Sequence, residues 1–354
     1  MRVAQDTAMH APTHDRAAVR LAWARSAAGD PAARLERASD DASFRSYWRL
    51  ASGARTLIVM DAPPDKEDVR PWLDIARRLR AAGVHAPAVY AEDAAQGFLL
   101  LEDLGTRTYL PALDEHSVDA LYGDALDALL RMQTRVDVAG LPPYDANRLI
   151  AEMELLPAWF LQRHLGFTPS CEQWDVIELA FRRLADSALA QPRAFVHRDY
   201  HSRNLLIVAE DNPGVIDFQD GVVGAVTYDL VSLLRDCYIA WDEARVEAWR
   251  EGFRERLRHA GLIDATVDAA RFRRWFDLMG LQRHLKVLGI FCRLWYRDGK
   301  RGYLGDLPLV WHYVRSVGAR YAEFADLLAL LERAIGGRDL TRPRDEAAAA
   351  GAAR

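Results

Sequence analysis

The sequence predicts an α+β protein of two lobes, in which a small β-rich lobe precedes a larger, mainly helical one. Between Arg34 and Glu102, short runs with strand-like alternation are separated by Gly and Pro turns and include one helical segment. After Leu104, most long segments instead have the spacing of amphipathic helices. The chain has 354 residues, of which 50% are hydrophobic, and this is enough for a core in each lobe.

The β-rich lobe is predicted over residues 34–103, after a tail and a helix in residues 1–33. The helix is expected at Asp15–Ala28, where apolar residues repeat at helical spacing until Gly29. The lobe is expected to contain strands at Arg34–Ala38, Phe44–Leu50, Arg55–Met60, His85–Ala91 and Phe98–Glu102, and a helix at Val69–Ala82. Alternation along the second strand puts Arg45 and Arg49 on one of its faces.

The helical lobe is predicted over residues 104–335, with Glu102–Leu104 as the hinge. Its helices are expected at Glu115–Val136, Arg148–His164, Glu172–Leu189, Tyr228–Ala240, Asp242–Ala260, Val267–Trp295, Leu307–Ala319 and Ala322–Ile335. Residues 336–354 contain few large apolar side chains, so this tail is expected to be disordered.

Composition excludes several classes of protein. Lys and Arg number 46 and Asp and Glu 51, so the net charge of −5 favours neither nucleic acid nor an anionic membrane as a partner. Three single cysteines form no C-x-x-C pair, which is typical of a reducing compartment. The N-terminus lacks the apolar core of a signal peptide, and no apolar run reaches membrane-spanning length. We expect a cytoplasmic protein with no obligate protein partner.

One stretch carries most of the chemistry. Residues 196–208 read VHRDYHSRNLLIV and fit the kinase catalytic-loop pattern H-x-D-x-x-x-x-N, and residues 213–219 read PGVIDFQ. Two short apolar runs joined by a turn predict a β-hairpin, which would return Asn204 and Asp217 to the same end. Both offer the oxygen ligands that Mg²⁺ prefers, whereas Asp199 can accept the proton of a substrate hydroxyl.

These residues resemble the aminoglycoside-phosphotransferase and choline-kinase superfamily, which has the two-lobed protein-kinase-like fold. The resemblance covers residues 34–335 and is most specific at HRDYHSRN (197–204) and IDFQD (216–220). A closer similarity is to the anomeric kinases of N-acetylmuramate and N-acetylglucosamine, which act in peptidoglycan recycling. It is carried by residues 41–50, 57–64, 99–105, 215–239, 284–291 and 297–308. The resemblance implies ATP and Mg²⁺ as cofactors and a small amino sugar phosphorylated at its C1 hydroxyl.

The resemblance also assigns expected roles around the loop. Asp199 is the catalytic residue, and Asn204 and Asp217 are the metal ligands. His197 braces the loop, and Asp229 opens a helix behind it and bonds its backbone amides. Two further residues, His201 within the loop and Asp220 after Asp217, are candidates to face the sugar.

The nucleotide side departs from the usual kinase pattern. No glycine-rich loop is present, and the small side chains of Ser39 and Ser43 stand in its place. The strand lysine that binds the phosphates is replaced by Met60. Arg45 and Arg49 are the candidates to supply the missing cation. Glu102 and Leu104 in the hinge complete the expected nucleotide site.

A basic face is predicted on the helix near residues 281–297. Arg283, Lys286, Arg293 and Arg297 fall within an arc of about 80° at 100° per residue. One interpretation is a solvated face of a core helix. The other makes Arg283, Lys286 and Arg297 part of the acceptor site, where they would attract the lactyl carboxylate of N-acetylmuramate.

Two alternatives to an amino-sugar kinase remain open at this point. The acceptor could be another small alcohol, such as an aminoglycoside, homoserine or choline. For choline, an aromatic box could come from Trp295, Tyr296, Trp311 and Tyr313. The chain could also be a nucleotide-binding pseudokinase, because Met60 cannot neutralise phosphate.

Overall fold

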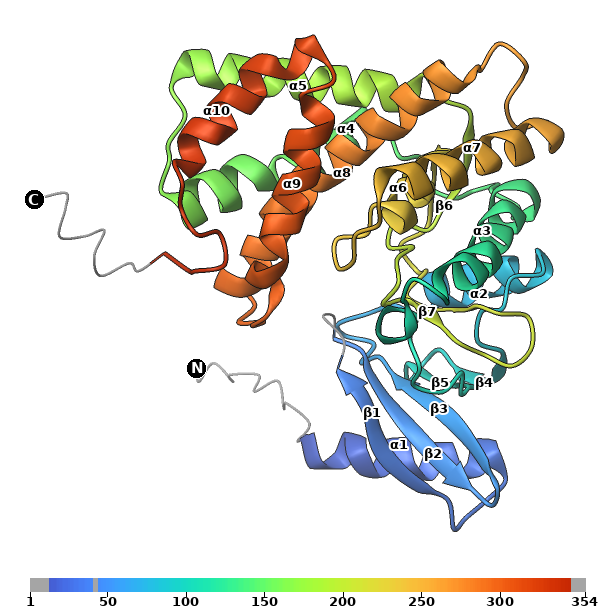
Figure 1. Cartoon of the computed structure of the whole chain (residues 1–354). Coiled ribbons are helices and arrows are strands. Elements are labelled where there is room, and N and C mark those ends of the chain that lie inside the picture. The colour runs from blue at the N-terminus through green and yellow to red at the C-terminus, as the bar shows by residue number, and fades with distance from the viewer. Residues whose placement is uncertain (1–12, 41–43, 345–354) are drawn as a thin grey trace, which may run out of the picture.

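The computed structural model describes residues 13–40 and 44–344 (Figure 1). A sheet with one helix across its face forms the N-terminal lobe, and the remaining helices form the C-terminal lobe. The predicted two-lobed α+β arrangement is therefore confirmed. None of the helices in the described ranges is both long and apolar enough to span a bilayer.

The N-terminal lobe is built on a five-stranded antiparallel sheet with strand order β1-β2-β3-β5-β4. The strands are β1 (Arg34–Asp40), β2 (Ser46–Ser52), β3 (Arg55–Asp61), β4 (Val89–Asp93) and β5 (Phe98–Glu102). Tyr47 of β2 lies opposite Met60 of β3 in this register. The strand predicted from His85 begins at Val89, and the one predicted from Phe44 begins at Ser46.

The two faces of the sheet pack against different parts of the protein. Helix α1 (Thr13–Ala28) lies across one face, where Leu50, Val59 and Leu100 are buried with Ala24. The other face, which carries Met60, packs toward α2 (Arg70–Ala81) and the C-terminal lobe. The alternation read from the sequence is therefore correct, because β-strand side chains point to opposite faces in turn.

The two lobes share one hydrophobic cluster. It runs from Met60 and Trp72 in the N-terminal lobe to Phe218 in the C-terminal lobe. The rings of Trp72 and Phe218 lie 5.0 Å apart, centroid to centroid. Helix α2 therefore packs directly against the segment that carries Asp217.

The C-terminal lobe is mainly helical. Its helices are α3 (Val118–Arg135), α4 (Ala146–Met153), α5 (Cys171–Leu189), α6 (Tyr228–Leu234), α7 (Glu243–His259), α8 (Ala269–Tyr296), α9 (Leu307–Gly318) and α10 (Ala325–Ile335). Helix α8 crosses the lobe, packs against α5, α6 and α9, and is buried along most of its 28 residues. Asp268 caps its first turn by accepting a hydrogen bond from the backbone N–H of Arg271.

Two of the observed helices differ most from the expected ones. The helix expected at Arg148–His164 is α4 followed by a π-helical segment, Leu156–Leu165, which has Pro157 in its first turn. Proline has no N–H to continue the preceding hydrogen-bond ladder. Helix α6 ends at Leu234 instead of Ala240, because Arg235 leaves helical geometry at φ −123°.

The disordered tail was predicted to start at residue 336, which is too early. Residues 336–344 return to the helical lobe, where Leu340 is buried. The carbonyl of Leu340 contacts His164 Nε2 at 3.1 Å, and the Arg338 guanidinium donates to the carbonyl of His164 at 3.0 Å. A single leucine and these polar contacts anchor this segment, which composition alone does not reveal. Residues 345–354 lie outside the described ranges.

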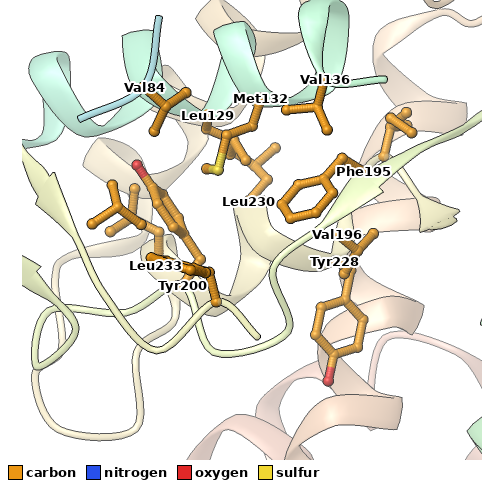
Figure 2. Close-up of a cluster of buried hydrophobic side chains, with 14 of the residues drawn as sticks. Val84, Leu129, Met132, Val136, Phe195, Val196, Tyr200, Tyr228, Leu230 and Leu233 are labelled. Carbon is orange, nitrogen blue, oxygen red and sulfur yellow. The ribbon is translucent and has the colours of Figure 1, made fainter. Parts of the chain in front are cut away.

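Short strands in the C-terminal lobe position the catalytic segments. β6 (Arg193–Val196) pairs with β9 (Val222–Ala225), and β7 (Leu205–Leu206) pairs with β8 (Gly214–Val215). Strands β6 and β9 were not predicted from the sequence, because each is a buried run of four residues without alternation. Figure 2 shows side chains of β6, α3 and α6 packed together, with Phe195 and Leu230 among them. This hydrophobic core supports the catalytic loop, which directly follows β6.

Candidate active site

The hairpin predicted from the sequence is present and brings the two expected metal ligands together. Asn204 precedes β7, and Asp217 follows β8 by two residues. The amide nitrogen of Asn204 donates to Asp217 Oδ2 at 3.3 Å and to the carbonyl of Asp199 at 3.0 Å. Gln219 also donates to Asp217, from Nε2 to Oδ1 at 3.0 Å. These bonds hold the side chains of Asn204 and Asp217 in place.

This donor set fits a magnesium ion. The Asn204 amide oxygen is not used in either bond above, and it lies beside a carboxylate, so both are hard oxygen donors. In the part of the chain that the structure describes, no group of three His, Cys, Asp or Glu side chains could hold a metal alone. Mg²⁺ typically takes one or two protein ligands and completes its coordination with phosphates and water, so two ligands suffice.

Asp199 lies in the loop between β6 and β7, and its side chain is 41% exposed. Its carboxylate Oδ1 is 4.0 Å from Arg283 Nη1. Burial acts to raise the pKa of Asp199, but the positive charges of Lys286 and Arg283 outweigh it and hold the pKa at about 2. The carboxylate is therefore ionised at neutral pH and can accept a hydrogen bond from a substrate hydroxyl.

The backbone of the loop is fixed by Asp229, which is fully buried in the first turn of α6. Its two carboxylate oxygens accept hydrogen bonds from the backbone N–H groups of His197 at 2.6 Å and Arg198 at 3.0 Å. These bonds hold Arg198 at φ +79°, a conformation uncommon for a residue with a side chain. Burial raises the pKa of Asp229 to about 7. The two N–H donors act to lower this pKa, but burial outweighs them.

His197 contacts the loop with both ring nitrogens. Nε2 lies 3.1 Å from the carbonyl of Ile216, and Nδ1 accepts from the backbone N–H of Asp199 at 3.3 Å. This pattern needs a neutral ring with its proton on Nε2. Burial supports that form, because it lowers the pKa of His197 to about 4. The side chain therefore links the loop to the strand before Asp217.

A buried charge network below the loop was missed by the sequence analysis. Glu152 on α4 accepts a hydrogen bond from Arg198 and from the hydroxyl of Tyr144, and lies 3.1 Å from Lys286 Nζ. Figure 2 shows the hydroxyl of Tyr228 pointing away from the apolar cluster, and this oxygen is 3.4 Å from Lys286 Nζ. No sequence motif marks Glu152, because the contact comes from the packing of α4 against α8.

The predicted basic face does not form one wall. Arg283 and Lys286 are almost fully buried, and Arg283 donates to the carbonyl of Arg198 at 2.8 Å. Arg297 directly follows α8, is 56% exposed in its side chain and pairs with Asp298 at 2.7 Å. Arg283 and Arg297 are fourteen residues apart, about 21 Å along a helix. Arg283 and Lys286 therefore support the catalytic loop from behind, and Arg297 lies elsewhere.

His201, two residues after Asp199, packs against an aromatic group. Its ring packs edge-on against Tyr238 at 5.4 Å, and Tyr238 stacks on Phe291. The guanidinium of Arg203 lies 3.6 Å above the Tyr238 ring. Nδ1 of His201 is buried and has no hydrogen-bond partner among the described residues. Burial lowers the pKa of His201, which favours the neutral form of the ring.

The expected nucleotide residues divide into separate groups. Ser39 is the next-to-last residue of β1 and pairs with Tyr47 of β2, and Ser43 lies outside the described residues. Glu102 accepts from the backbone N–H of Ala88 at 3.0 Å, and Leu104 is buried in the hinge. Arg49 lies near this hinge, where its guanidinium makes two bonds to Asp103 at 2.6 and 3.0 Å. Arg45 and Asp220 lie elsewhere and line one pocket with Met60.

Comparison with known proteins identifies a family. A family profile described as the phosphotransferase enzyme family matches residues 34–274, which include the sheet, the predicted catalytic loop and the candidate metal ligands. A Pseudomonas aeruginosa protein named N-acetylmuramate/N-acetylglucosamine kinase is 49% identical over 302 residues, covering 85% of this chain and 88% of the relative.

Two further relatives have the same name. The Pseudomonas putida protein is 46% identical and covers 87% of this chain and 90% of its own length. The protein of Neisseria meningitidis is 41% identical and covers 86% of this chain and 91% of its own length. The similarity therefore extends over nearly the whole of each protein.

Solved structures show the same fold at low sequence identity. An ethanolamine kinase of Plasmodium vivax has a TM-score of 0.61 at 10% identity, covering 88% of this chain and 93% of that one. An ADP-bound aminoglycoside phosphotransferase has a TM-score of 0.56 at 15% identity, covering 85% and 98%. The predicted protein-kinase-like fold is thus confirmed.

Proposed function

The chain belongs to the phosphotransferase enzyme family, and we propose that it is an ATP- and Mg²⁺-dependent kinase of amino sugars. Its acceptor would be the anomeric C1 hydroxyl of N-acetylmuramate, N-acetylglucosamine or both, and its product the sugar 1-phosphate. The observation that carries this proposal is the set of Asp199, Asn204 and Asp217 at the end of one hairpin, in a chain up to 49% identical to kinases with that name.

Each of the three residues would have one task. The ionised carboxylate of Asp199 would orient the acceptor hydroxyl and accept its proton. Asn204 and Asp217 would hold Mg²⁺, which supplies the charge that the phosphates need during transfer. Since phosphoryl transfer depends mainly on positioning and electrostatics, the rigid support of this loop by Asp229 and His197 favours an active enzyme over a pseudokinase.

The charge around Asp199 supports a neutral or anionic acceptor. Arg203, Arg283 and Lys286 all lie close to the catalytic loop. An aminoglycoside carries several ammonium groups and would need carboxylates there.

Choline is a poor fit to the aromatic residues considered for it. Tyr296 bonds His164 Nδ1 through its hydroxyl at 3.1 Å, and Tyr313 is buried against His284 with ring centroids 4.8 Å apart. Both rings are thus used in packing between helices instead of forming an open cage for a quaternary ammonium.

The proposed acceptor also suits a weak base. The anomeric hydroxyl is more acidic than the other alcohols of the sugar. Its proton can therefore be removed with the help of a weak base, such as a carboxylate with a pKa of about 2. The co-substrate ATP and the three single cysteines fit a reaction in the cytoplasm. A sugar 1-phosphate is suited to later nucleotidyl transfer, so we assign the enzyme to the recycling of peptidoglycan sugars.

A coupled assay of ADP release tests the substrate class. We expect acceptor-dependent release with N-acetylmuramate or N-acetylglucosamine, and only background release with aminoglycosides, choline, homoserine or no acceptor. Turnover of an aminoglycoside or choline in preference to both sugars would contradict the proposal. Nucleotide binding without turnover of any acceptor would favour the pseudokinase.

A further inference from the structure

The phosphate-binding cation of this enzyme cannot come from its usual position. In protein kinases a lysine on strand β3 holds the α- and β-phosphates and is positioned by a glutamate from the following helix. Here the corresponding strand position is Met60, which is fully buried. A thioether carries no charge, so another residue must balance the phosphates.

An arginine–glutamate pair lies beside Met60. Arg45 comes directly before β2 and is only 8% exposed, and its Nε lies 3.2 Å from Glu67 Oε1. Glu67 precedes α2 by three residues. Both side chains line a pocket of about 150 Å³ together with Met60 and Trp72. The pair therefore joins the beginning of β2 to the segment just before α2, much as the lysine–glutamate pair joins a strand and a helix in protein kinases.

The same pocket reaches the metal residues. Gln219 and Asp220 form its wall on the side of the C-terminal lobe. Gln219 Nε2 donates to Asp217 Oδ1 at 3.0 Å, so only one side chain separates the pocket from the candidate metal ligand. Among the described residues that line the pocket, Arg45 is the only base, and Glu67, Asp68 and Asp220 carry negative charge. A phosphate bound there needs the charge of Arg45.

Arg49 cannot perform this task in the same way. It lies on the same face of β2, four residues and about 13 Å along the strand from Arg45. Both carboxylate oxygens of Asp103 bind the Nε–Nη2 edge of its guanidinium near the predicted hinge. Its charge is therefore neutralised at the opposite end of the sheet from Glu67.

We propose that Arg45 binds the α- and β-phosphates of ATP and that Glu67 positions it. The inference rests on the proposed function only in taking ATP as the phosphate donor. A guanidinium has five N–H donors in a planar fork, so one edge can contact Glu67 while another contacts a phosphate. Asp220 then belongs to the phosphate side of the site and does not contact the sugar.

Binding of ADP and of adenosine to the full-length protein, measured by calorimetry without acceptor, tests this proposal. We expect Arg45→Ala to weaken Mg–ADP binding by about 10- to 100-fold, because charge-assisted bonds to phosphate are lost. Adenosine has no phosphate, so its affinity should change by less than about 2-fold, a change too small to reflect a lost hydrogen bond. Arg45→Gln, which has a similar reach without charge, should behave in the same way if the alanine variant does not fold.

Two further variants sharpen the test. Arg77→Ala removes an arginine of α2 that pairs with Glu92 away from the pocket, and its side chain is 63% exposed, so ADP affinity should not change. Adding Met60→Lys to Arg45→Ala should restore part of the ADP affinity by returning a cation to β3. Unchanged ADP binding in Arg45→Ala, or an equal loss for ADP and adenosine, would overturn the proposal. Because no acceptor is present, a wrong sugar assignment would not affect this result.

Discussion

An Asp199→Asn variant is expected to bind ATP nearly as the wild type does, but to turn over about 10²–10⁴ times more slowly, the range typical of a lost general base. Asparagine keeps the size of the side chain and can still donate and accept hydrogen bonds. It cannot take the proton of the acceptor hydroxyl. Steady-state kinetics with saturating sugar and ATP would give the change in kcat.

The control for this change is Asp175→Asn on the exposed side of α5, which should leave kcat unchanged. Near-normal turnover of a folded Asp199→Asn variant would remove Asp199 from the mechanism. The pH dependence gives a second check. The pKa of Asp199 is lowered to about 2, so its carboxylate is protonated only near and below that pH. Its protonation should therefore cause no loss of kcat/KM between pH 7 and pH 5.

Replacement of Asp217 by Asn should lower activity by on the order of 10³ or more, because the full negative charge facing the metal is lost. Asparagine is preferable to alanine here, because Asp217 has a φ of +64° and asparagine tolerates that conformation. Asn204→Ala should have a smaller effect, since it removes a neutral ligand. The measurement is activity over a range of Mg²⁺ concentrations, where excess Mg²⁺ should restore part of the lost rate.

Glu210→Ala is the matched control for the metal site, because it removes an exposed carboxylate from the turn of the same hairpin. We expect its Mg²⁺ dependence to equal that of the wild type. If Asp217→Asn reaches normal turnover at ordinary Mg²⁺ concentration, then Asp217 is not the metal ligand.

Local patterns predicted the parts of the site that lie close together in sequence. Asn204 and Asp217 meet because a short hairpin joins them, and a hairpin is specified by its own turn and apolar runs. The contact of Asp229 with the loop joins residues 31 and 32 positions apart, and the family resemblance predicted it where a local pattern could not. Long helices were also predictable, because their apolar spacing repeats over several turns.

Contacts made by tertiary packing could not be predicted. Glu152 and Arg198 are 46 residues apart, and only the packing of α4 beneath the loop brings them together. Spacing predicted that Arg283 and Lys286 lie near each other on α8, but it cannot tell what covers them. In the fold, Glu152 and the loop backbone cover Lys286 and Arg283, and the charges of these two residues act on Asp199 from behind.

The central claim is that phosphate is transferred to the anomeric hydroxyl, and NMR of the product tests it most directly. With N-acetylglucosamine as acceptor, we predict that phosphorus couples to the C1 proton. A methyl glycoside, which has no free C1 hydroxyl, should not react, and a 6-deoxy analogue should. Coupling to the C6 protons, together with reaction of the methyl glycoside, would contradict anomeric phosphorylation.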